Sequence, residues 1–298
     1  MANISSEYLG AAHDFTFSER DFRMISDLAN ARYGLFLQPS KKALVHSRLA
    51  KRLRALNLGS FQEYCELLNQ TKGDEEQTHL LSALTTNVTH FFREAHHFEY
   101  LQQKIVPEIL SKAKAGSPLR IWSAACSTGQ EAYSIAATLL SSEPDLRKLD
   151  IKVLATDIDP HVIKIARSGT YPSEQIAMIP EKWRRTLSKS AVVENGQIRF
   201  DDTLKSMISF GELNLIADWP MKRKFDVIFC RNAAIYFDKT TQARLWQRLA
   251  GALSNEGYLM IGHSERLNGP AESAFKSVGI TSYQKQPIRN DQDKGDKN

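Results

Sequence analysis

Small and acidic residues follow two predicted strands in a pattern that can hold a nucleoside. The first strand runs into the loop 123–129, SAACSTG, where a helix opens. Small side chains let this backbone turn tightly and approach a ligand closely. The second strand ends at Asp157, whose carboxylate can accept hydrogen bonds from both ribose hydroxyls of a nucleoside. The loop lacks the GxGxxG fingerprint that a pyrophosphate needs, whereas S-adenosylmethionine (SAM) is a nucleoside cofactor without phosphate.

Both features also have an ordinary structural explanation. The loop 123–129 can be a plain turn from a strand into a helix. Asp157 can be the N-cap of the helix that opens at Pro160, a role that suits Asp159 better because Asp159 directly precedes the proline. The two acids can therefore divide the roles of ligand and cap.

Other polar residues follow the remaining predicted strand ends. Arg231 and Asn232 come after the strand 225–230, where a cofactor and a substrate would meet, and Tyr236 follows shortly. Asn214-Leu215 forms a further polar strand end. Together these side chains can contact a ligand at the carboxyl edge of one sheet.

The segment 85–97, TTNVTHFFREAHH, precedes this pattern and mixes hydroxyls, an amide, aromatic rings and an arginine. Its ordinary explanation is a loop between helices, with Phe91 and Phe92 in the core. His90, His96 and His97 match no usual spacing of metal ligands, and we expect His96 and His97 on different sides of a helix. The three cysteines are scattered and form no CxxC pair. We therefore predict no metal site.

Short apolar runs alternate with helical stretches and must position these residues. Strands are predicted at 119–125, 151–156, 225–230 and 258–262, with helices at 130–140, 160–168 and 239–253. This alternation predicts a parallel, doubly wound α/β sheet. Residues 170–208 interrupt it, and the hairpin sequence around Asn195-Gly196 predicts a small inserted β-subdomain.

The first 85 residues are predicted to be helical. The clearest helix spans about 39–56, and its apolar stripe consists of Val45, Leu49, Leu53 and Leu56. Four basic residues lie off the stripe and are expected mostly toward solvent: Lys41, Arg48, Lys51 and Arg52. A solvated basic face explains such a helix. The absence of any acid from residues 41–54 favours a surface that docks an acidic partner instead.

Composition and segment boundaries complete the prediction. The domains are expected at 1–85 (helical, docking), 86–118 (linker and cofactor contacts), 119–286 (catalytic) and 287–298 (polar, disordered tail). The net charge of +5 suits an acidic partner if the basic residues cluster. No stretch approaches the ~20 apolar residues that span a bilayer, and no secretory signal is recognisable. A reduced, cytoplasmic protein is therefore expected.

Five motifs in order resemble the CheR family of chemotaxis receptor methyltransferases. They are TNVTHFFRE, RIWSAACSTGQEAYSIA, ATDID, FDVIFCRNAAIYFDK and GYLMIGHSE, and the match runs from about Phe17 to Tyr283. The resemblance implies a Rossmann-like class I SAM methyltransferase domain with an inserted β-subdomain, preceded by a small all-α domain. It also implies methylation of glutamate carboxylates in the cytoplasmic helical bundle of chemoreceptors, with S-adenosylhomocysteine (SAH) as product.

The resemblance also implies roles for particular residues. Cofactor contacts would be made by Asn87, Thr89, Arg93, Glu131, Asp157, Asn214, Leu215, Arg231 and Asn232. Arg93 and Tyr236 would lie near the transferred methyl group. The chain departs from the family's usual GEEPYS at 129–134 and from RNVMIYF at Ala233-Ala234, and its insertion is more divergent. In some family members the insertion adds a receptor tail peptide to its sheet, and for this chain that partner stays open.

Two other functions remain as alternatives. A nucleic acid methyltransferase would contact phosphate through the basic helix, but the sequence has no recognisable RNA-binding module. A SAM-binding scaffold without activity would have no need for Arg93, Asp157, Arg231 and Tyr236, all of which are present. We therefore predict an enzyme that uses SAM, with no nucleic acid partner and no membrane insertion.

Overall fold

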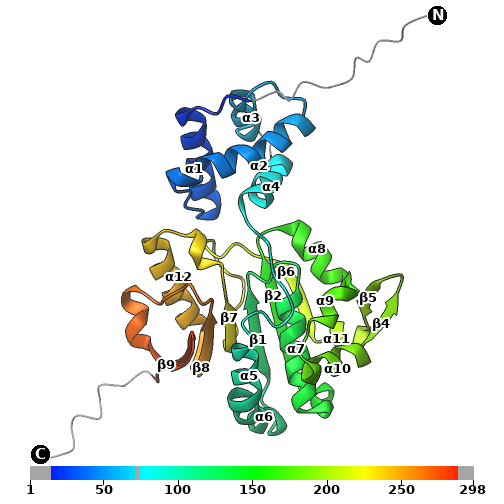
Figure 1. Ribbon diagram of the computed structural model, residues 1–298. Helices are drawn as coiled ribbons and strands as arrows, with labels where there is room; N and C mark the ends of the chain where they lie inside the picture. Colours follow the sequence, from blue (N-terminus) through cyan, green and yellow to red (C-terminus); the bar gives the residue numbers. More distant parts are fainter. Residues whose placement is uncertain (1–14, 71–73, 288–298) are drawn as a thin grey trace, which may run out of the picture. The chain divides into compact units, whose positions relative to one another are not determined.

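The computed structural model describes residues 15–70 and 74–287, which divide into two compact units (Figure 1). The first unit contains residues up to 32 and 37–85, and the second contains residues 33–36 and those from 86 onward. Almost all of the predicted tail, 287–298, lies outside the described residues. Within the described residues, no helix is long and apolar enough to cross a membrane.

The first unit is built from helices. Its described elements are α1 (Glu19–Tyr33), a 3-10 turn (Pro39–Lys41), α2 (Lys42–Ala55), α3 (Phe61–Leu68) and α4 (Asp74–Leu84). The apolar stripe of α2 is confirmed for Val45, Leu49 and Leu53, which are buried, while Leu56 at the helix end is half-buried. The chain leaves α2 at Asn57 through a left-handed conformation, with φ of 54°.

A seven-stranded sheet forms the centre of the second unit. Its strands are β1 (Leu119–Ala124), β2 (Ile151–Asp157), β6 (Ile208–Glu212), β7 (Phe225–Cys230), β8 (Leu253–Ile261), β9 (Phe275–Gly279) and β10 (Ser282–Lys285). They lie in the order β6-β2-β1-β7-β8-β10-β9. The first five are parallel, and β10 is antiparallel to both of its neighbours. The predicted doubly wound α/β fold is confirmed, and β6, β9 and β10 extend it beyond the predicted strands.

Helices cover both faces of this sheet, because successive residues of a strand point to opposite sides. Ile121 belongs to the apolar cluster under α7 (Gln130–Ser142), whereas its neighbour Trp122 belongs to the cluster under α12 (Lys239–Ala252). The helix α8 (Pro160–Ser168) follows β2 and packs against β2 and β6. Further 3-10 turns lie at Pro144–Lys148, Ala234–Tyr236 and Gly269–Ala274.

Residues 96–114 form helices and are not part of a linker. They comprise α5 (His96–Tyr100), a π-helical turn (Leu101–Ile105) and α6 (Val106–Lys114). Buried side chains recur along them at helical spacing: Phe98, Leu101, Ile105 and Ile109. They join the core on the α7 side of the sheet. This part of the segment predicted as linker and cofactor contacts, 86–118, is therefore helical and packed, and its three- and four-residue apolar spacing is the sequence signal for these helices.

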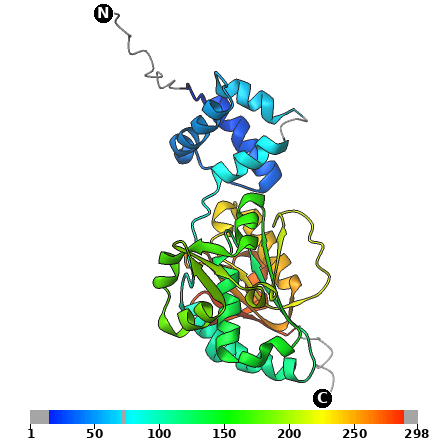
Figure 2. The ribbon, with the colours of Figure 1, turned by 90° about the vertical axis from the view of Figure 1, so that its right-hand side faces the viewer.

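The insertion forms a small subdomain between α8 and β6. It contains β3 (Thr170–Pro172), α9 (Ser173–Ala177), α10 (Glu181–Lys189), β4 (Ala191–Glu194), β5 (Gln197–Phe200) and α11 (Asp202–Lys205). The predicted hairpin is confirmed: Asn195 and Gly196 join β4 to β5 with φ of 51° and 72°. Trp183 stacks on Phe92, with ring centroids 4.2 Å apart, and so fixes the insertion to the sheet domain. Figure 2 shows the green insertion and the amber α12 on opposite sides of this unit.

Candidate active site

The predicted site residues lie mostly on loops at the carboxyl edge of the sheet. β1 lies between β2 and β7, so the winding reverses there and opens the crevice in which α/β proteins bind ligands. Gly129 ends the β1 loop with φ of 96°, and a Cβ at this position would lie 2.8 Å from Ala166 Cβ. The loop therefore requires glycine where α7 begins.

Asp157 and Asp159 have different tasks. Asp157 accepts the Ser127 N–H at 2.8 Å through Oδ2 and the Asp159 N–H at 3.1 Å through Oδ1. Asp159 accepts the His161 N–H at 2.9 Å and caps α8. Burial raises the pKa of Asp157, although its N–H donors oppose that shift. Asp157 is thus held rigidly at the end of β2, with lone pairs left for a ligand.

The segment 86–93 is tied to the loops after β1 and β2. The Asn87 side-chain amide donates to Asp159 Oδ2 at 3.0 Å, and the Ser127 hydroxyl donates to the Asn87 carbonyl at 2.8 Å. Thr89 lies two residues further along and is half-buried. The amide of Asn87 therefore serves the cap of α8, while its backbone lies beside the β1 loop.

Arg93 and Tyr236, the two residues predicted near the methyl group, both contact this segment. Arg93 Nη1 donates to the Val88 carbonyl at 3.0 Å, and the Tyr236 hydroxyl donates to the Thr86 carbonyl at 3.3 Å. Both side chains are half-buried. The turn 234–236 after β7 carries Tyr236 to a segment that is 150 positions away in the sequence.

Arg231 lies at the centre of a buried ion-pair network. Its Nη1 is 2.9 Å from Glu131 Oε2, and its Nη2 is 3.2 Å from Glu94 Oε2. Nη2 also donates to the Arg93 carbonyl, and the Ser123 hydroxyl donates to Glu131 Oε1 at 2.7 Å. Two predicted cofactor residues are therefore paired with each other. The Arg231 side chain is 2% exposed. Through these contacts it connects the segment 86–93 and α7 to the end of β7.

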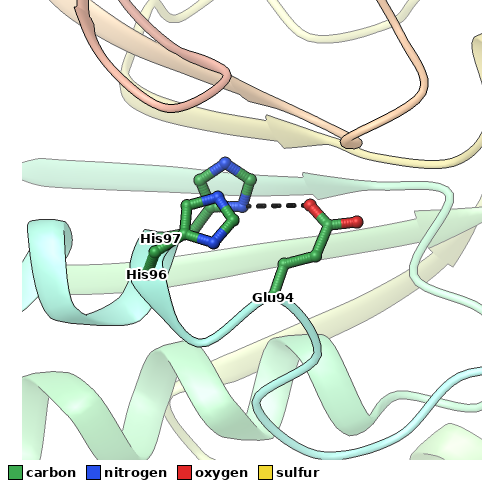
Figure 3. A group of neighbouring side chains, drawn as sticks. All are labelled: Glu94, His96 and His97. Carbon is green, nitrogen blue, oxygen red and sulfur yellow. Dashed lines mark ion pairs between the residues drawn. The ribbon is translucent and has the colours of Figure 1, made fainter.

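Glu94, His96 and His97 gather beside this network (Figure 3). One potential metal-binding atom from each lies within 4.8 Å of the others, and the two imidazole centroids are 4.2 Å apart. The expectation that the histidines point to different sides of a helix is wrong, because α5 begins at His96 and both rings lie beside Glu94. Burial lowers the pKa of His97 to about 3, and the charge of Arg231 acts in the same direction.

Neighbouring residues stabilise the ionised form of Glu94. Burial alone would raise the pKa of Glu94, but the Arg231 charge and hydrogen bonds from His263 lower it to about 2. His263 Nδ1 lies 3.0 Å from Glu94 Oε1. The segment after Arg93 is thereby fixed to the end of β8 as well as to β7.

The remaining predicted residues lie at two other loops. Asn214 accepts the Ile216 N–H at 3.0 Å in an Asx turn, and Leu215 is buried in the cluster under α12. Asn232 has φ of 57°, and its N–H donates to Glu265 Oε2 at 3.0 Å. Glu265 was not predicted as a site residue, because it follows β8 by several residues and reading the strand ends does not reach it. The signal that could have found it is its place as the last residue of the motif GYLMIGHSE.

In the first unit, only part of the predicted docking set is exposed, namely Lys41 and Lys51. Arg48 Nη1 donates to the carbonyls of residues 83–85 at the end of α4. Arg52 makes two hydrogen bonds with the buried carboxylate of Glu76, at 2.9 and 2.5 Å. The expectation that both arginines face mostly solvent is wrong, because the last carbonyls of a helix and a buried acid both need donors.

Fold and site together define the class of protein. A doubly wound sheet of this order, an anchored acid at the end of β2 and no pyrophosphate fingerprint are the features of a class I SAM-dependent methyltransferase. Two family models match the chain: the CheR methyltransferase SAM-binding domain over residues 87–284, and the CheR methyltransferase all-alpha domain over residues 20–85. The chain therefore belongs to the CheR methyltransferase family.

Similar proteins cover most of this chain. The probable chemotaxis protein methyltransferase of Rhizobium etli is 49% identical over 84% of this chain and 94% of its own length. Chemotaxis protein methyltransferase 2 of Pseudomonas aeruginosa is 41% identical over 91% of this chain and 94% of its own. The Escherichia coli chemotaxis protein methyltransferase is 39% identical, with coverages of 89% and 91%.

Proposed function

We propose that this protein methylates glutamate side chains in the cytoplasmic helical bundle of chemoreceptors, as a step of chemotaxis adaptation. SAM is the donor and SAH the product. The observation that carries the proposal is that the anchored Asp157, the segment 86–93 and Tyr236 share one edge of the sheet in a CheR family member. The names of its relatives point to chemotaxis.

The chemistry needs positioning more than activation. A glutamate side chain has an unperturbed pKa of about 4.3, so it is ionised at neutral pH and requires no general base. The sulfonium of SAM is already a good leaving group. Holding the carboxylate in line with the S–CH₃ bond can contribute ~7–11 kcal/mol.

Each predicted residue receives a role in this proposal. Asp157 accepts the ribose hydroxyls, Arg93 orients a carboxylate of the cofactor or the substrate, and Tyr236 bounds the methyl pocket. Glu94 and Glu131 bring two negative charges to the single charge of Arg231, and the excess suits the ammonium group of SAM. The cofactor site is completed by Asn87, Thr89, Asn214, Leu215 and Asn232.

We infer that the reaction uses no metal. The Arg231 guanidinium lies 3.2 Å from Glu94 Oε2, within the carboxylate that would have to bind the ion, and its charge repels a divalent cation. A sulfonium donor also needs no Lewis acid. We place the enzyme in the cytoplasm, because its proposed substrate region lies there.

Two surfaces are proposed to contact the receptor. Lys41, Lys51 and Arg54 are exposed along or beside α2 and suit an acidic helical bundle. The strand β4 forms an edge of the inserted sheet and exposes Val192 and Val193 by 54% and 66%. Such an edge can add a receptor tail peptide as a further strand.

The test is to follow the methyl group of radiolabelled SAM. Incubation with a receptor cytoplasmic fragment should give label on the receptor that mild base releases, as expected of a carboxylate methyl ester. The matched control is Asp157→Ala, which should transfer little label at limiting SAM. Label on tRNA or DNA, or base-stable label on protein, would contradict the proposal.

A further inference from the structure

One buried carboxylate holds the backbone that follows β7. Glu265 Oε2 accepts the N–H of Asn232 at 3.0 Å and that of Gly262 at 2.6 Å, while Oε1 accepts the N–H of Ala234 at 2.8 Å. The Ile235 N–H adds a further hydrogen bond. Backbone donors from two loops therefore converge on a side chain that is 4% exposed.

Backbone N–H groups, not a cationic side chain, compensate the charge of Glu265. Arg231, at the start of this loop, forms ion pairs with Glu94 and Glu131 instead. Burial raises the pKa of Glu265, and the backbone donors oppose that shift. A buried carboxylate is costly unless hydrogen bonds compensate it, so this arrangement links the charge of Glu265 to the shape of the loop.

The loop after β7 makes a sharp turn directly beside the end of β8. Asn232 has φ of 57°, in the left-handed region that asparagine adopts more readily than most residues. At Gly262, a Cβ would lie 2.6 Å from Asn232 Nδ2 and 2.9 Å from Glu265 Oε2. The end of β8 and the loop after β7 thus pack backbone against backbone, and the turn with Tyr236 follows directly.

We propose that Glu265 is a positioning residue for methyl transfer. It acts through the loop 231–236, which it fixes so that Tyr236 reaches the segment 86–93 at the methyl group. This inference rests on the proposed role of Tyr236. Its physical basis is that the Tyr236 hydroxyl donates a hydrogen bond to the Thr86 carbonyl at 3.3 Å. This distance depends on the position of the turn 234–236.

The first experiment compares Glu265→Gln with Glu272→Gln, a control at an exposed position. Glutamine keeps the size but replaces one acceptor oxygen by a donor, so at least one loop N–H loses its partner. We expect kcat at saturating SAM to fall about tenfold or more, while the Kd for SAH changes less than about threefold. Amide hydrogen exchange of residues 231–237 should become about tenfold faster. The control should change none of these.

A double variant separates positioning from general destabilisation. If Glu265 acts through Tyr236, then Glu265→Gln combined with Tyr236→Phe should be no slower than the slower single variant, within about twofold. Rate losses that multiply, or unchanged hydrogen exchange in Glu265→Gln, would overturn the proposal. If the glutamine variant does not fold, Glu265→Asp keeps the charge on a shorter side chain and should show the same pattern.

Hydrogen exchange needs no methyl acceptor, so the two proposals can fail separately. If the unmutated enzyme did not label receptor fragments, the proposed substrate would be wrong. Faster hydrogen exchange in Glu265→Gln would then still support the proposal that Glu265 fixes the loop 231–236, and unchanged exchange would still reject it.

Discussion

Among single residues, Asp157 has the most direct proposed link to the cofactor. Two backbone N–H groups hold its carboxylate at the end of β2, and its neighbour Asp159 takes over the helix cap. We expect Asp157→Ala to weaken SAM and SAH binding by at least about tenfold, because the ribose hydroxyls lose a preorganised acceptor. Calorimetric titration measures this. Full affinity in the variant would move the ribose contact to another residue.

Arg231 is expected to matter for stability before it matters for binding. Arg231→Met leaves the largely buried carboxylates of Glu94 and Glu131 without their shared cation, and breaking a buried pair in this way costs about 3–5 kcal/mol. Urea unfolding of the cofactor-free protein should show this loss, whereas Arg244→Met at an exposed position should not. Equal stability of the two variants would mean that Arg231 serves the cofactor alone.

At the scale of elements, α2 combines structural and exposed basic residues. Lys51→Glu combined with Arg54→Glu should raise the apparent KM for receptor severalfold and leave SAM affinity unchanged, because attraction to an acidic bundle becomes repulsion. Added salt should mimic the effect in the unmutated enzyme, since charges are screened beyond about 8 Å at physiological ionic strength. Methylation assays at low and high salt measure both.

Arg48→Ala is the matched contrast within the same helix. It removes the donor that serves the carbonyls of residues 83–85, so thermal stability should fall while the salt dependence of KM is retained. A charge-reversed variant that methylates receptors normally at low salt would shift docking from α2 to the insertion and its edge strand β4.

At the scale of the whole molecule, the buried network makes stability depend on pH. His97 is fully buried, and its pKa is lowered to about 3. Below pH 6.5 the His97 side chain is therefore protonated in the unfolded chain but stays neutral in the folded protein until the pH approaches 3. Stability is therefore lost as pH falls from 6.5 toward 3, by ~1.4 kcal/mol for each pH unit. The lowered pKa of Glu94, about 2, adds its own loss only below 4.5.

The variant His97→Gln tests this dependence. Glutamine cannot take up the proton, so the unfolding free energy should fall less steeply between pH 6.5 and 5.0 than in the unmutated protein. Arg231, His96 and Glu94 face His97 and are unchanged in both proteins. Denaturant titrations at several pH values provide the measurement. Parallel curves would show that His97 is not the source of the acid sensitivity.

The sequence by itself determined the central strands of the sheet, the loops at their carboxyl ends and the hairpin of the insertion. Apolar periodicity and turn residues act within a few positions of the chain, so β1, β2, β7 and the Asn195-Gly196 hairpin could be predicted from local pattern. The division between Asp157 and Asp159 also followed locally, from the proline after Asp159. The five ordered motifs were sufficient to indicate the family.

Only the tertiary structure decided which charged groups are paired. Arg231 and Glu131 are 100 positions apart, and no spacing rule connects them. The same holds for Arg48 and Arg52. A helical pattern places both on a solvated face, but in the structure they form hydrogen bonds with groups of α4. It holds also for Glu265, which accepts hydrogen bonds from Asn232 and Ala234 in another loop. Backbone periodicity is a local property, whereas the partner of a buried charge is fixed by which segments the fold brings within hydrogen-bond distance.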